Sequence, residues 1–409
     1  MSVSTGEVLE DWRISHVVPL FKKGSKSNLG NNRLVSLTSA VGKLLEEVLR
    51  DRIYKYLDRQ GLIRESQHGF VHDRSCLTNL LEFFEEVTRK VDEGKAVDVV
   101  YMDFSKAFDV VLHGRLVMKI QSLGIHGEVV NWIRLWLNGR SQRVVVEDCF
   151  SEWRSVTSGM LQGSELGPLL FVIYINDLDD NVVNWISKFA DDTKIGGVVD
   201  SEEGFQSLQR DLDQLEKWAE KWQMEFNTDK CEVLHFGRTN QGRTYKVNGR
   251  TLRSAVEQRD LGIQIQNSLK VVSQVDRVVK RAFGILAFIN QNIEYKNWNV
   301  MVRLYKALVR PNLEYCMQFW SPNYWKDINK VERVQRRFTR MLLGLEKMSY
   351  RERLNRLGLY SLERRRMKGD LIEVYKVMMG IDRVNASRLF PLRPGEKKNQ
   401  RTWVKGEGG

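Results

Sequence analysis

Two adjacent aspartates, Asp191 and Asp192, lie in the segment SKFADDTKIGG, between an apolar stretch and a pair of glycines. Carboxylates in contact raise each other's pKa and oppose folding unless a cation lies between or beside them. A third aspartate, Asp103, ends the β-branched run AVDVVYMD. If the two segments are neighbouring strands of one antiparallel sheet, the three carboxylates meet. Such a cluster can hold two divalent cations for phosphoryl transfer, and Mg²⁺ needs only a few carboxylate oxygens besides water and phosphate.

Each of these aspartates also has an ordinary structural explanation. A lone Asp-Asp pair is a polar hairpin turn by roughly ten to one. Asp103 alone fits the N-cap of a helix that begins with SKAFD. The three residues by themselves therefore leave a metal site and a purely structural role open.

The composition bounds the class of protein. With 409 residues, of which 42% are hydrophobic, the chain is long enough for two or three packed subdomains. The excess of 64 Lys and Arg over 52 Asp and Glu gives a net charge of +12, which favours a polyanionic partner. Four widely spaced cysteines indicate neither a zinc module nor a disulfide framework.

The first residues and the apolar runs indicate in which compartment of the cell the protein is expected. The start, MSVSTGEVLEDWRISHVVPL, lacks the basic flank and apolar run of a secretion signal. The longest apolar run, Leu169–Ile175, is far shorter than the about 20 residues that span a bilayer, and it predicts a buried strand or helix. We therefore expect an intracellular protein, nuclear or cytoplasmic, that is neither secreted nor inserted in a membrane.

Hydrophobic periodicity predicts the elements that position the aspartates. Helices are expected over residues 37–59 and 77–91, followed by a buried strand that ends at Asp103. The segment NWISKFADDTKIGGVV predicts a hairpin with Asp191 and Asp192 as its two-residue turn. The aspartates would thus lie at the ends of strands.

Beyond this hairpin the chain becomes increasingly helical. Apolar residues recur at steps of three and four from Phe205 to Trp222, which predicts an amphipathic helix packed on the rest of the protein. From Val275 onward we expect helices rich in Arg and Lys. The last segment lacks apolar periodicity and is expected to be disordered. The order predicts an α+β fold in which a central domain with an antiparallel sheet is flanked by helices and followed by a helical C-terminal region.

Several segments carry a resemblance to a known family. YMDFSKAFDVV, SGMLQGSELGPLLFVIYINDL, FADDTKIGG, FNTDKCEVLHFG and RDLGIQI resemble, in this order, the palm motifs of reverse transcriptases. DWRISHVVPLFKKGSKSNLGNNRLVSLTS and ESQHGFVHDRSC resemble the fingers motifs, and LVRPNLEYCMQFWSPNYWKDINKVERVQRRFTRML resembles the thumb. The resemblance is to LINE-type (non-LTR) retrotransposons of the jockey-like kind, and it extends over residues 10–393.

The resemblance implies a right-hand polymerase fold. It places the fingers at residues 1–96, the palm at 97–265, a helical thumb at 266–345, a helical C-terminal extension at 346–392 and a disordered tail at 393–409. The implied activity is that of an RNA-directed DNA polymerase, which extends a primer 3′-hydroxyl with deoxynucleotides on an RNA template. The implied cofactors are two Mg²⁺ ions, with Mn²⁺ as the alternative.

The resemblance also implies which residues do the chemistry. Asp103 and Asp191 would be metal ligands, the backbone carbonyl of Phe104 a further ligand, and Asp192 a close support for the pair. Lys230 matches the lysine that protonates the pyrophosphate leaving group. A lysine in a polar loop is about as often only solvated.

Five other residues match the family's nucleotide pocket: Arg33, Arg74, Phe108, Gln162 and Gly163. The two arginines would hold the incoming triphosphate, which suits the bidentate guanidinium fork. The ring of Phe108 would exclude a ribose 2′-hydroxyl, so that DNA rather than RNA is made. Without the resemblance, an isolated Arg is a surface residue, a Phe on a helix belongs to the core, and the LQG segment is a turn.

Leu261 and Gly262 match the strand turn that grips the primer. In the thumb, four arginines recur at steps of three and four and can share one helix face while apolar residues pack inward: Arg333, Arg336, Arg337 and Arg340. Such a charge run is usually only a solvated face. A duplex product would give it a partner through salt-dependent contacts with phosphates. An RNA template and a DNA primer are thus the implied partners.

The sequence departs from the family's pattern at working positions, although none of the departures removes an expected metal ligand. The replacements are Asn32 and Leu34 beside Arg33, Val71 and Asp73 before Arg74, Leu161 before Gln162, and Glu165 after it. If the glycine that Asp73 replaces needs positive φ, Asp73 strains its loop, and it adds negative charge beside the triphosphate site.

Two other functions stay open. A catalytically weakened or silent, element-derived nucleic-acid-binding protein would explain these replacements, and a maturase-like RNA-folding factor would bind one structured RNA. The family usually carries an endonuclease upstream, and nothing before Trp12 is long enough to be one. We therefore expect that the chain does not nick DNA unaided and receives its primer end from elsewhere.

Overall fold

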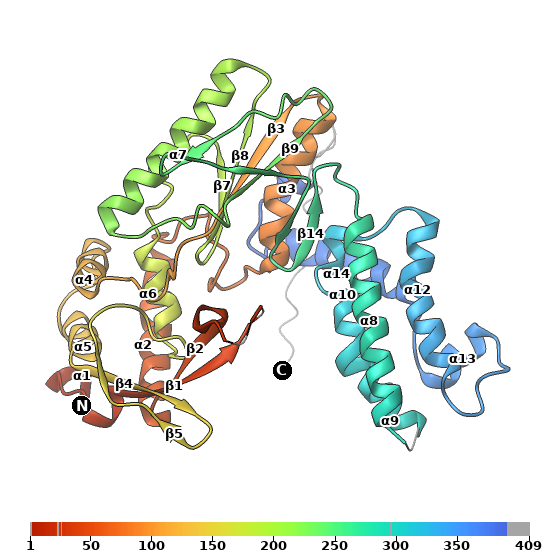
Figure 1. Ribbon diagram of the computed structural model, residues 1–409, viewed down its shortest axis with the longest axis horizontal. Helices are drawn as coiled ribbons and strands as arrows, with labels where there is room; N and C mark the ends of the chain where they lie inside the picture. The colour runs from red at the N-terminus through yellow and green to blue at the C-terminus, as the bar shows by residue number, and fades with distance from the viewer. Residues whose placement is uncertain (1, 23, 26, 295–296, 391–409) are drawn as a thin grey trace, which may run out of the picture.

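The computed structural model describes residues 2–22, 24–25, 27–294 and 297–390. The fingers and palm ranges occupy the left and the top of Figure 1, and the thumb helices stand on the right. The tail at 393–409, which was expected to be disordered, lies outside the described residues. Among the helices of the described chain, none is long and apolar enough to cross a bilayer.

The palm range contains a five-stranded sheet in the order β12-β9-β3-β8-β7. The strands are β3 (Val97–Met102), β7 (Trp185–Phe189), β8 (Asp192–Val198), β9 (Glu232–Phe236) and β12 (Arg253–Ala255). The four strands β7, β8, β3 and β9 pair antiparallel, as expected, and β12 adds a parallel edge. Beside this sheet, a short hairpin of β10 (Lys246–Val247) and β11 (Arg250–Thr251) packs against helix α7 (Glu202–Trp222).

The central strand β3 is buried on both faces, since all six of its residues are buried. Val100 and Met102 belong to one apolar cluster, which includes residues of α7. Val99 and Tyr101 belong to a second cluster, which includes residues of α3 and the thumb. A strand enclosed in this way favours the β-branched residues that fill it.

The hairpin β7–β8 carries the two adjacent aspartates. Its register pairs Phe189 with Asp192, so the two-residue turn consists of Ala190 and Asp191. The prediction that both aspartates form the turn is therefore wrong by one residue, because Asp192 begins β8. Ala190 supplies the left-handed backbone that such a turn needs, with φ of 55°, and it is buried against the fingers.

A second sheet joins segments from both sides of the expected boundary between fingers and palm. Its order is β2-β1-β4-β5, with β6 paired to β4. The strands are β1 (Ile14–Phe21), β2 (Asn32–Leu37), β4 (Arg140–Val146), β5 (Cys149–Phe150) and β6 (Arg154–Val156). The strands β4, β5 and β6 thus extend the sheet of β1 and β2, which we call the fingers sheet.

Helices surround the two sheets. The expected helix at 77–91 is α3 (Cys76–Asp92), which begins with a capping box formed by Ser75 and Thr78. The longest apolar run forms a helix rather than a strand, α6 (Gly167–Tyr174), and apart from Pro168 all its residues are buried. The remaining helices of this part are α1 (Ser2–Thr5), α2 (Ala40–Arg59), α4 (His113–Ser122) and α5 (Glu128–Leu137).

The thumb follows a small hairpin of β13 (Glu257–Asp260) and β14 (Ile263–Gln266). Its helices are α8 (Val272–Asn292), α9 (Trp298–Leu304), α10 (Arg310–Glu314), α11 (Met317–Trp320) and α12 (Trp325–Arg340), with a π-helical turn at Tyr305–Val309. Helix α8 packs against β14 on one side and α12 on another. In Figure 1, α8 accordingly stands between α12 and the palm strands.

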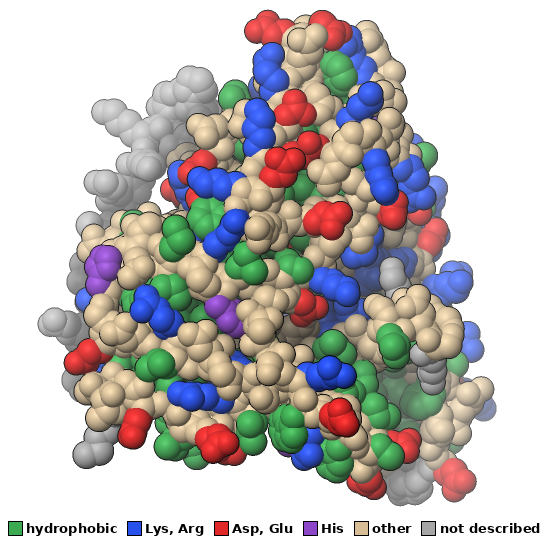
Figure 2. Space-filling view, turned by 60° about the vertical axis from the view of Figure 1, so that its left-hand side comes forward, with side chains coloured by type: hydrophobic (Ala, Val, Ile, Leu, Met, Phe, Trp, Pro, Cys, Tyr) green, Lys and Arg blue, Asp and Glu red, His purple; other side chains and the backbone are tan. Residues whose placement is uncertain are grey.

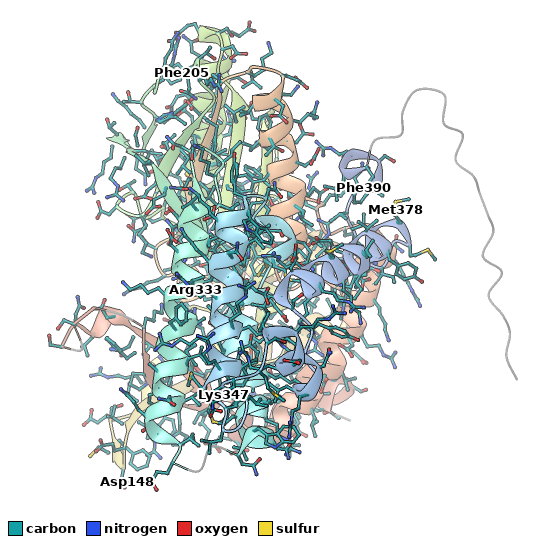
Figure 3. All side chains as sticks on the ribbon, turned by 90° about the vertical axis from the view of Figure 1, so that its right-hand side faces the viewer. Asp148, Phe205, Arg333, Lys347, Met378 and Phe390 are labelled. Atoms are coloured by element: carbon teal, nitrogen blue, oxygen red, sulfur yellow. The ribbon has the colours of Figure 1, made fainter. Side chains whose placement is uncertain are left out.

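The C-terminal extension consists of α13 (Tyr350–Leu357), α14 (Leu362–Met378) and α15 (Ala386–Leu389). The chain then returns to the fingers, where Arg383 pairs with Asp58 of α2 and Arg388 pairs with Glu86 of α3. Figure 3 shows Met378 and Phe390 on one side of the molecule, near this return. The extension therefore braces the fingers as well as the thumb.

Candidate active site

The three aspartates meet at one end of the palm sheet. Met102, the last residue of β3, pairs with Thr193 of β8. Asp103 extends one position further and therefore lies opposite Asp192, while Asp191 precedes Asp192 in the turn. A pocket of about 110 Å³ opens at this point, and its lining includes Asp103, Asp192, Lys230 and residues 258–261.

The carboxylates carry more negative charge than their surroundings neutralise. Loss of solvation raises the pKa of Asp191, the charge of Asp103 raises it further, and Lys230 and Arg33 act in the opposite direction. Asp192 is exposed at the rim of the sheet. Its carboxyl group is nevertheless largely surrounded by protein atoms, so loss of solvation, followed by the charges of Asp191 and Asp103, raises its pKa to about 7. A cluster of this kind attracts cations.

One cation already lies at the cluster. The Nζ of Lys230 is 3.1 and 3.2 Å from the two carboxylate oxygens of Asp103. As the side chains stand, no group of three or more His, Cys, Asp or Glu residues in the described chain is arranged to hold a metal ion. The donor set still suits Mg²⁺, because the hard carboxylates of Asp103 and Asp192 line one pocket, where the lysine ammonium now supplies a positive charge. Metal binding would require Asp103 to exchange this lysine for the ion.

The backbone after Asp103 is held by a short bridge to the facing segment. The Asn227 N–H donates to the Asp103 carbonyl, and the Ser105 N–H donates to the carbonyl of Glu225, both at 2.7 Å. Phe104 lies between them, and its side chain is buried. Neither hydrogen bond uses the carbonyl of Phe104, which is the further metal ligand that the resemblance implies.

A fingers residue without an expected role holds the turn that carries Asp191. Gln67 is fully buried, and its Oε1 accepts hydrogen bonds from the backbone N–H of Gly69 at 2.8 Å and of Ala190 at 3.0 Å. Gly69 permits this approach, since a Cβ at that position would lie 2.3 Å from the nitrogen of Ala190. The QHGF segment was part of the resemblance to the fingers motifs, but it pointed to no function for its glutamine.

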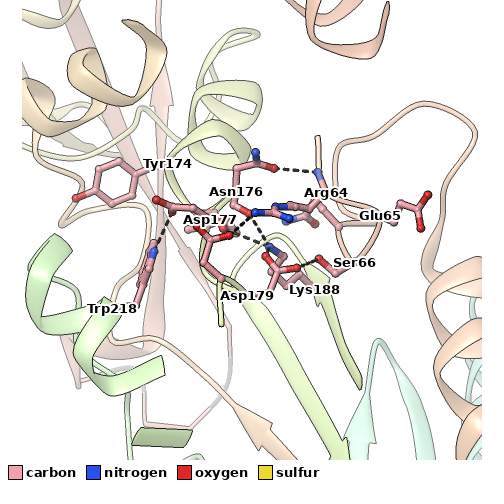
Figure 4. Close-up of polar contacts among 12 residues, drawn as sticks. Arg64, Glu65, Ser66, Tyr174, Asn176, Asp177, Asp179, Lys188 and Trp218 are labelled. Atoms are coloured by element: carbon pink, nitrogen blue, oxygen red, sulfur yellow. Dashed lines mark hydrogen bonds and ion pairs between the residues drawn. The ribbon is translucent and has the colours of Figure 1, made fainter. Parts of the chain in front are cut away.

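The same fingers loop is attached to β7 (Figure 4). The Nζ of Lys188 is buried and donates to Asp179 at 2.7 Å and to the carbonyl of Asn176 at 3.1 Å. The hydroxyl of Ser66 donates to the other Asp179 oxygen at 2.6 Å. The backbone adds two bonds, from the His68 N–H to the Lys188 carbonyl and from the Lys188 N–H to the Ser66 carbonyl. The loop therefore runs beside β7 like an additional strand and supports the turn that carries Asp191.

A buried ion pair joins the palm sheet to the β13–β14 hairpin. Lys194 of β8 and Asp260 of β13 form a salt bridge, with only 4% and 7% of their side chains exposed. The Nζ of Lys194 also lies 5.0 and 5.4 Å from the ring centroids of Phe83 and Phe84 on α3. Burial lowers the pKa of Lys194, and Asp260 opposes this shift. The pair thereby fixes one wall of the pocket against the other.

Three of the expected nucleotide residues lie where the fingers sheet meets the palm. Arg33 is exposed on β2, near enough to Asp191 for its charge to lower the pKa of that carboxyl. On the same strand, the Ser36 N–H donates to the carbonyl of Gln162 at 2.7 Å. Gly163 has φ of 121°, and a Cβ there would lie 2.6 Å from the Ser36 oxygen. Only glycine fits this contact, which holds β2 against the segment of Gln162 and Gly163.

The other two expected nucleotide residues have structural partners. Phe108 stacks on Phe171 of α6 at a centroid distance of 4.1 Å, and Phe70 approaches it edge-on at 6.5 Å. Phe108 as a whole is half-buried. The guanidinium of Arg74 donates to two backbone carbonyls of the fingers loop, including that of Glu65. Arg74 therefore supports the loop, and a contact with a triphosphate would require it to leave these carbonyls.

The structure accommodates the residues that replace the family's usual ones in its fingers and nucleotide-pocket motifs. Asp73 has φ of 60°, so its position does require left-handed backbone, which Asp tolerates better than most residues. Its carboxylate lies 3.8 Å from the guanidinium of Arg383. Glu165 pairs with Arg50 of α2. Two apolar replacements are buried: Val71 and Leu161. Both added negative charges thus have a positive partner.

Leu261 and Gly262 form the turn between β13 and β14, with φ of 43° and 89°. The hydroxyl of Tyr315 in the thumb donates to the Leu261 carbonyl at 2.9 Å. Arg277 of α8 donates to the Gly262 carbonyl at 3.3 Å. Neither hydrogen bond was expected from the sequence. Because Leu261 lines the pocket, the thumb acts on the pocket wall through this turn.

The four arginines of α12 share an exposed face, and Val334 and Phe338 are buried beneath them as predicted. Their guanidinium groups engage no carboxylate in the described chain, where the ion pairs of α12 involve Lys330 instead. They do not line the pocket. Since α8 stands between α12 and the palm, these arginines are farther from the aspartates than the residues of α8.

Helix α8 carries a basic face that the sequence did not single out. Arg277, Lys280 and Arg281 lie at helical spacing, and we call them the α8 basic cluster. Arg259 of β13 is close enough for its charge to lower the pKa of Arg277 after the effect of burial. Figure 2 shows Lys and Arg side chains gathered towards the right-hand side of its view, around a hollow in the surface. Because Arg259 also lines the pocket, basic side chains extend from α8 to the pocket.

Comparison with known proteins gives one family match and several relatives. The model of the family described as reverse transcriptase (RNA-dependent DNA polymerase) matches residues 21–275. The RNA-directed DNA polymerase from mobile element jockey of Drosophila funebris is 26% identical over 352 residues, covering 80% of this chain and 37% of the relative. The probable RNA-directed DNA polymerase from transposon X-element of Drosophila melanogaster is 23% identical, covering 82% of this chain and 38% of the relative. The chain thus spans well under half the length of these relatives.

Solved structures resemble the chain in fold alone. Telomerase from Candida albicans, in complex with a fragment of telomeric RNA, has a TM-score of 0.51 at 11% identity, covering 88% of this chain and 68% of that protein. Telomerase from Candida tropicalis with the same kind of fragment also has a TM-score of 0.51 at 11% identity, covering 93% and 60%. The right-hand polymerase architecture expected from the sequence is confirmed by these similarities and by the family match.

Proposed function

Because the chain belongs to the reverse transcriptase (RNA-dependent DNA polymerase) family, we propose that it is the polymerase part of a LINE-type, jockey-like retrotransposon. In this proposal it extends the 3′-hydroxyl of a DNA primer with deoxynucleotides along an RNA template, in the nucleus or the cytoplasm. The names of its jockey and X-element relatives, which are RNA-directed DNA polymerases, support this activity.

The observation that carries the proposal is the register of β3 and β8. The pairing of Met102 with Thr193 sets Asp103 opposite Asp192 and close to Asp191. A slip of one residue would turn Asp103 to the other face of the sheet, because side chains alternate along a strand. This register sets Asp103 and Asp192 on the lining of one pocket, which supports the proposed metal site.

We propose that Asp103 and Asp191 hold two Mg²⁺ ions, with the Phe104 carbonyl as a further ligand and Asp192 in support; Mn²⁺ is the alternative. Bound ions of this kind lower the pKa of an attacking hydroxyl and stabilise charge on a transferring phosphate. Lys230 lies at the edge of the pocket. From there its ammonium can donate a proton to the leaving pyrophosphate.

The residues around β2 would bind the incoming nucleotide. Arg33 is exposed beside Asp191, which suits contact with a triphosphate. Gln162 and Gly163 would contact the nucleotide beside β2, held in place by their contacts with Ser36. The ring of Phe108, fixed by stacking on α6, would exclude a 2′-hydroxyl. For Arg74 we propose a supporting role in the fingers loop.

The thumb would hold the primer–template duplex by its phosphates. The α8 basic cluster suits this role because Arg277 contacts the turn at Leu261 and Gly262, where the primer end would lie. For Arg333, Arg336, Arg337 and Arg340 we propose a second contact, farther from the pocket. Contacts with phosphates are tolerant of sequence and weaken with added salt.

Primer extension on an RNA template with Mg²⁺ and deoxynucleotides tests the proposal. We expect the purified chain to extend the primer and Asp191→Ala to reduce the rate about 10³-fold or more, the size of effect expected when a group that organises several kcal/mol of charge stabilisation is removed. Asp92→Ala, which changes an exposed aspartate of α3, serves as the control and should extend normally.

The same experiment separates the other two functions. A chain that binds the primer–template but extends it no faster than Asp191→Ala would be a silent nucleic-acid-binding protein, and the proposal would be wrong. Tight binding to one structured RNA without extension would indicate an RNA-folding factor. The pairing of Asp73 with Arg383 and of Glu165 with Arg50 favours an active polymerase, since neither replacement leaves an unpaired negative charge at the nucleotide site.

A further inference from the structure

Helix α14 presents an apolar face to solvent on the side away from the thumb. On its inward side, Leu362 is buried, and a Cβ at Gly369 would lie 2.6 Å from the Cε of Met317 on α11. On the outward side, four large apolar residues are 62%, 71%, 39% and 60% exposed, and we call them the α14 seam: Met367, Leu371, Val374 and Met378. In Figure 3, Met378 marks the outer end of α14.

The spacing of the α14 seam is that of a helix packed against a second helix. Its residues follow one another at steps of four, three and four, which is a repeat of 3.5 residues on average. A repeat of this length keeps the side chains on a line that faces a partner helix, in the a and d positions of a heptad. A surface helix of a monomer has one apolar stripe, which faces the core. Because α14 already packs on its inward side, its outward stripe indicates a further partner.

The apolar surface of this face is large enough for the core of an interface. Ile372 and Tyr375 lie beside the seam and are 46% and 58% exposed. Together with the seam they present on the order of 600 Å² of apolar surface, the upper end of the largest patch on a typical monomer. A specific interface takes about 800 Å² from each partner, and its rim is polar. The polar residues along α14 would supply this rim.

The charges beside the seam indicate which partner fits it. Glu363 and Lys368 are exposed and flank the seam on its two sides, five positions apart. The ion pairs of α14 in the described chain involve Arg365 and Lys376 instead. In two parallel helices in register, the residue at position g of one helix meets the residue at the following position e of the other. Glu363 and Lys368 occupy these two positions, so α14 is complementary in charge to a second copy of itself.

We infer that α14 is a dimerisation helix, through which two copies of this chain pack seam against seam, parallel and in register. Leu371 and Met378 then each meet their own counterpart in the second copy, and Glu363 of each copy meets Lys368 of the other. The two bodies lie on opposite sides of the helix pair, because each α14 is covered by its own thumb on the inward side. No residue of the seam lines the pocket at the aspartates, so the inference does not depend on the proposed function.

Sedimentation equilibrium of the full chain, free of nucleic acid, measures the association. We expect a monomer of 47.8 kDa that converts to a dimer as the concentration rises. The Leu371→Glu and Met378→Glu variants should each raise the dimer Kd at least about 30-fold, since they bury a charge at the centre of the interface. Met118→Glu places the same charge at an exposed apolar residue of α4, 63% exposed, and should leave the Kd unchanged.

A charge exchange distinguishes a second copy of the chain from any other helix. Glu363→Lys sets like charges opposite each other across a parallel pair and should raise the dimer Kd about fivefold at low salt. Glu363→Lys/Lys368→Glu exchanges the two charges in both copies and should restore the original Kd. If the double variant dimerises as weakly as Glu363→Lys does, the parallel register is wrong.

Cysteine crosslinking gives an independent measurement that does not depend on the glutamate variants. In the inferred register Leu371 faces its own counterpart. Leu371→Cys should therefore form a dimer linked by a disulfide when the thiols are oxidised with diamide, visible on a non-reducing gel. Met118→Cys and the wild type, which has four cysteines of its own, should remain monomeric on the same gel.

The outcomes separate this inference from the proposed function. A chain that stays monomeric up to about 100 μM, a dimer that Leu371→Glu and Met118→Glu weaken equally, or no crosslink through Leu371→Cys would each overturn the inference. A chain that dimerises as inferred but does not extend a primer would overturn the proposed polymerase and leave the dimerisation helix in place.

Discussion

Positive side chains are paired with carboxylates around the pocket at the end of the palm strands. They are unpaired on the basic surfaces around it. In the palm, lysines are buried with a carboxylate partner, as in the pairs of Lys194 with Asp260 and Lys188 with Asp179. On the thumb and the fingers sheet, cations such as Arg281 and Arg143 are unpaired with any carboxylate in the described chain and remain accessible to solvent.

The paired lysines of the palm therefore hold the pocket together, whereas the unpaired cations on the surface are available to bind a ligand. A buried charge is costly unless it is paired, so pairs in the palm fix the positions of strands and turns. An exposed cation costs little and gains most when it meets a polyanion. Mutations in the palm should therefore change the stability of the fold and the geometry of the pocket. Mutations on the basic surfaces should change the affinity for nucleic acid and its dependence on salt.

The largest expected effect comes from breaking a buried palm pair. Lys194→Met leaves Asp260 charged and buried, and should lower the free energy of unfolding by about 3–5 kcal/mol in urea denaturation. Lys194→Met/Asp260→Leu should recover most of this loss. Lys90→Met removes one half of an exposed pair with Glu93 and should cost no more than about 1 kcal/mol. Equal losses for Lys194→Met and Lys90→Met would contradict the distinction between the two regions.

A third buried lysine predicts a pH effect on stability. Lys119 of α4 is 5% exposed, and burial lowers its pKa to about 8 despite the neighbouring Asp177. Between pH 8 and 10.5 the folded protein therefore binds fewer protons than the unfolded chain, so stability should rise with pH in this window. At about 1.4 kcal/mol per pKa unit, the rise is about 3 kcal/mol.

Lys119→Met tests this rise, because it removes the titrating group and should flatten the curve between pH 8 and 10.5. Urea denaturation of the two proteins at several pH values measures the difference. The same slope in the variant and the wild type would show that Lys119 does not titrate in this window.

If Asp191 holds a metal ion as proposed, the support of its turn by Gln67 predicts an effect on rate. Gln67→Leu removes the acceptor for the Ala190 N–H, and a displaced Asp191 should slow primer extension about 10²-fold with a smaller change in KM. Gln67→Glu keeps an acceptor oxygen at the same place and should recover most of the rate. If both variants lose the same rate, the hydrogen bond to the turn is not what Gln67 contributes.

The smallest expected effect concerns the basic surfaces. Replacing Arg277, Lys280 and Arg281 by Gln should weaken duplex binding about tenfold and reduce the salt slope by about one for each phosphate that the variant no longer neutralises. Replacing Arg333, Arg336, Arg337 and Arg340 by alanine should have a smaller effect, because α12 lies farther from the pocket. Filter binding measures both, and unchanged affinity in the second variant would remove the proposed role of the α12 arginines.

Much of the fold and part of the site could be predicted from local pattern. The helical spacing that buries Val334 and Phe338 and exposes the α12 arginines is a property of one helix. The meeting of Asp103 with Asp191 and Asp192 followed from two strand segments and a family resemblance. In contrast, Gln67 could not be assigned, since its function depends on the contact of its loop with Ala190, far away in the chain.

The sequence by itself determined the α+β order of elements, the residue types at the strand ends and the family to which they point. Periodicity and motifs are local, because they depend on residues close together in the chain. Only the tertiary structure decided that Asp192 opens a strand rather than completing a turn, that β4 to β6 belong to the fingers sheet, and that α8 stands between the palm and α12. These three features depend on register and layer order, which arise when distant segments pack against one another, and no local pattern encodes them.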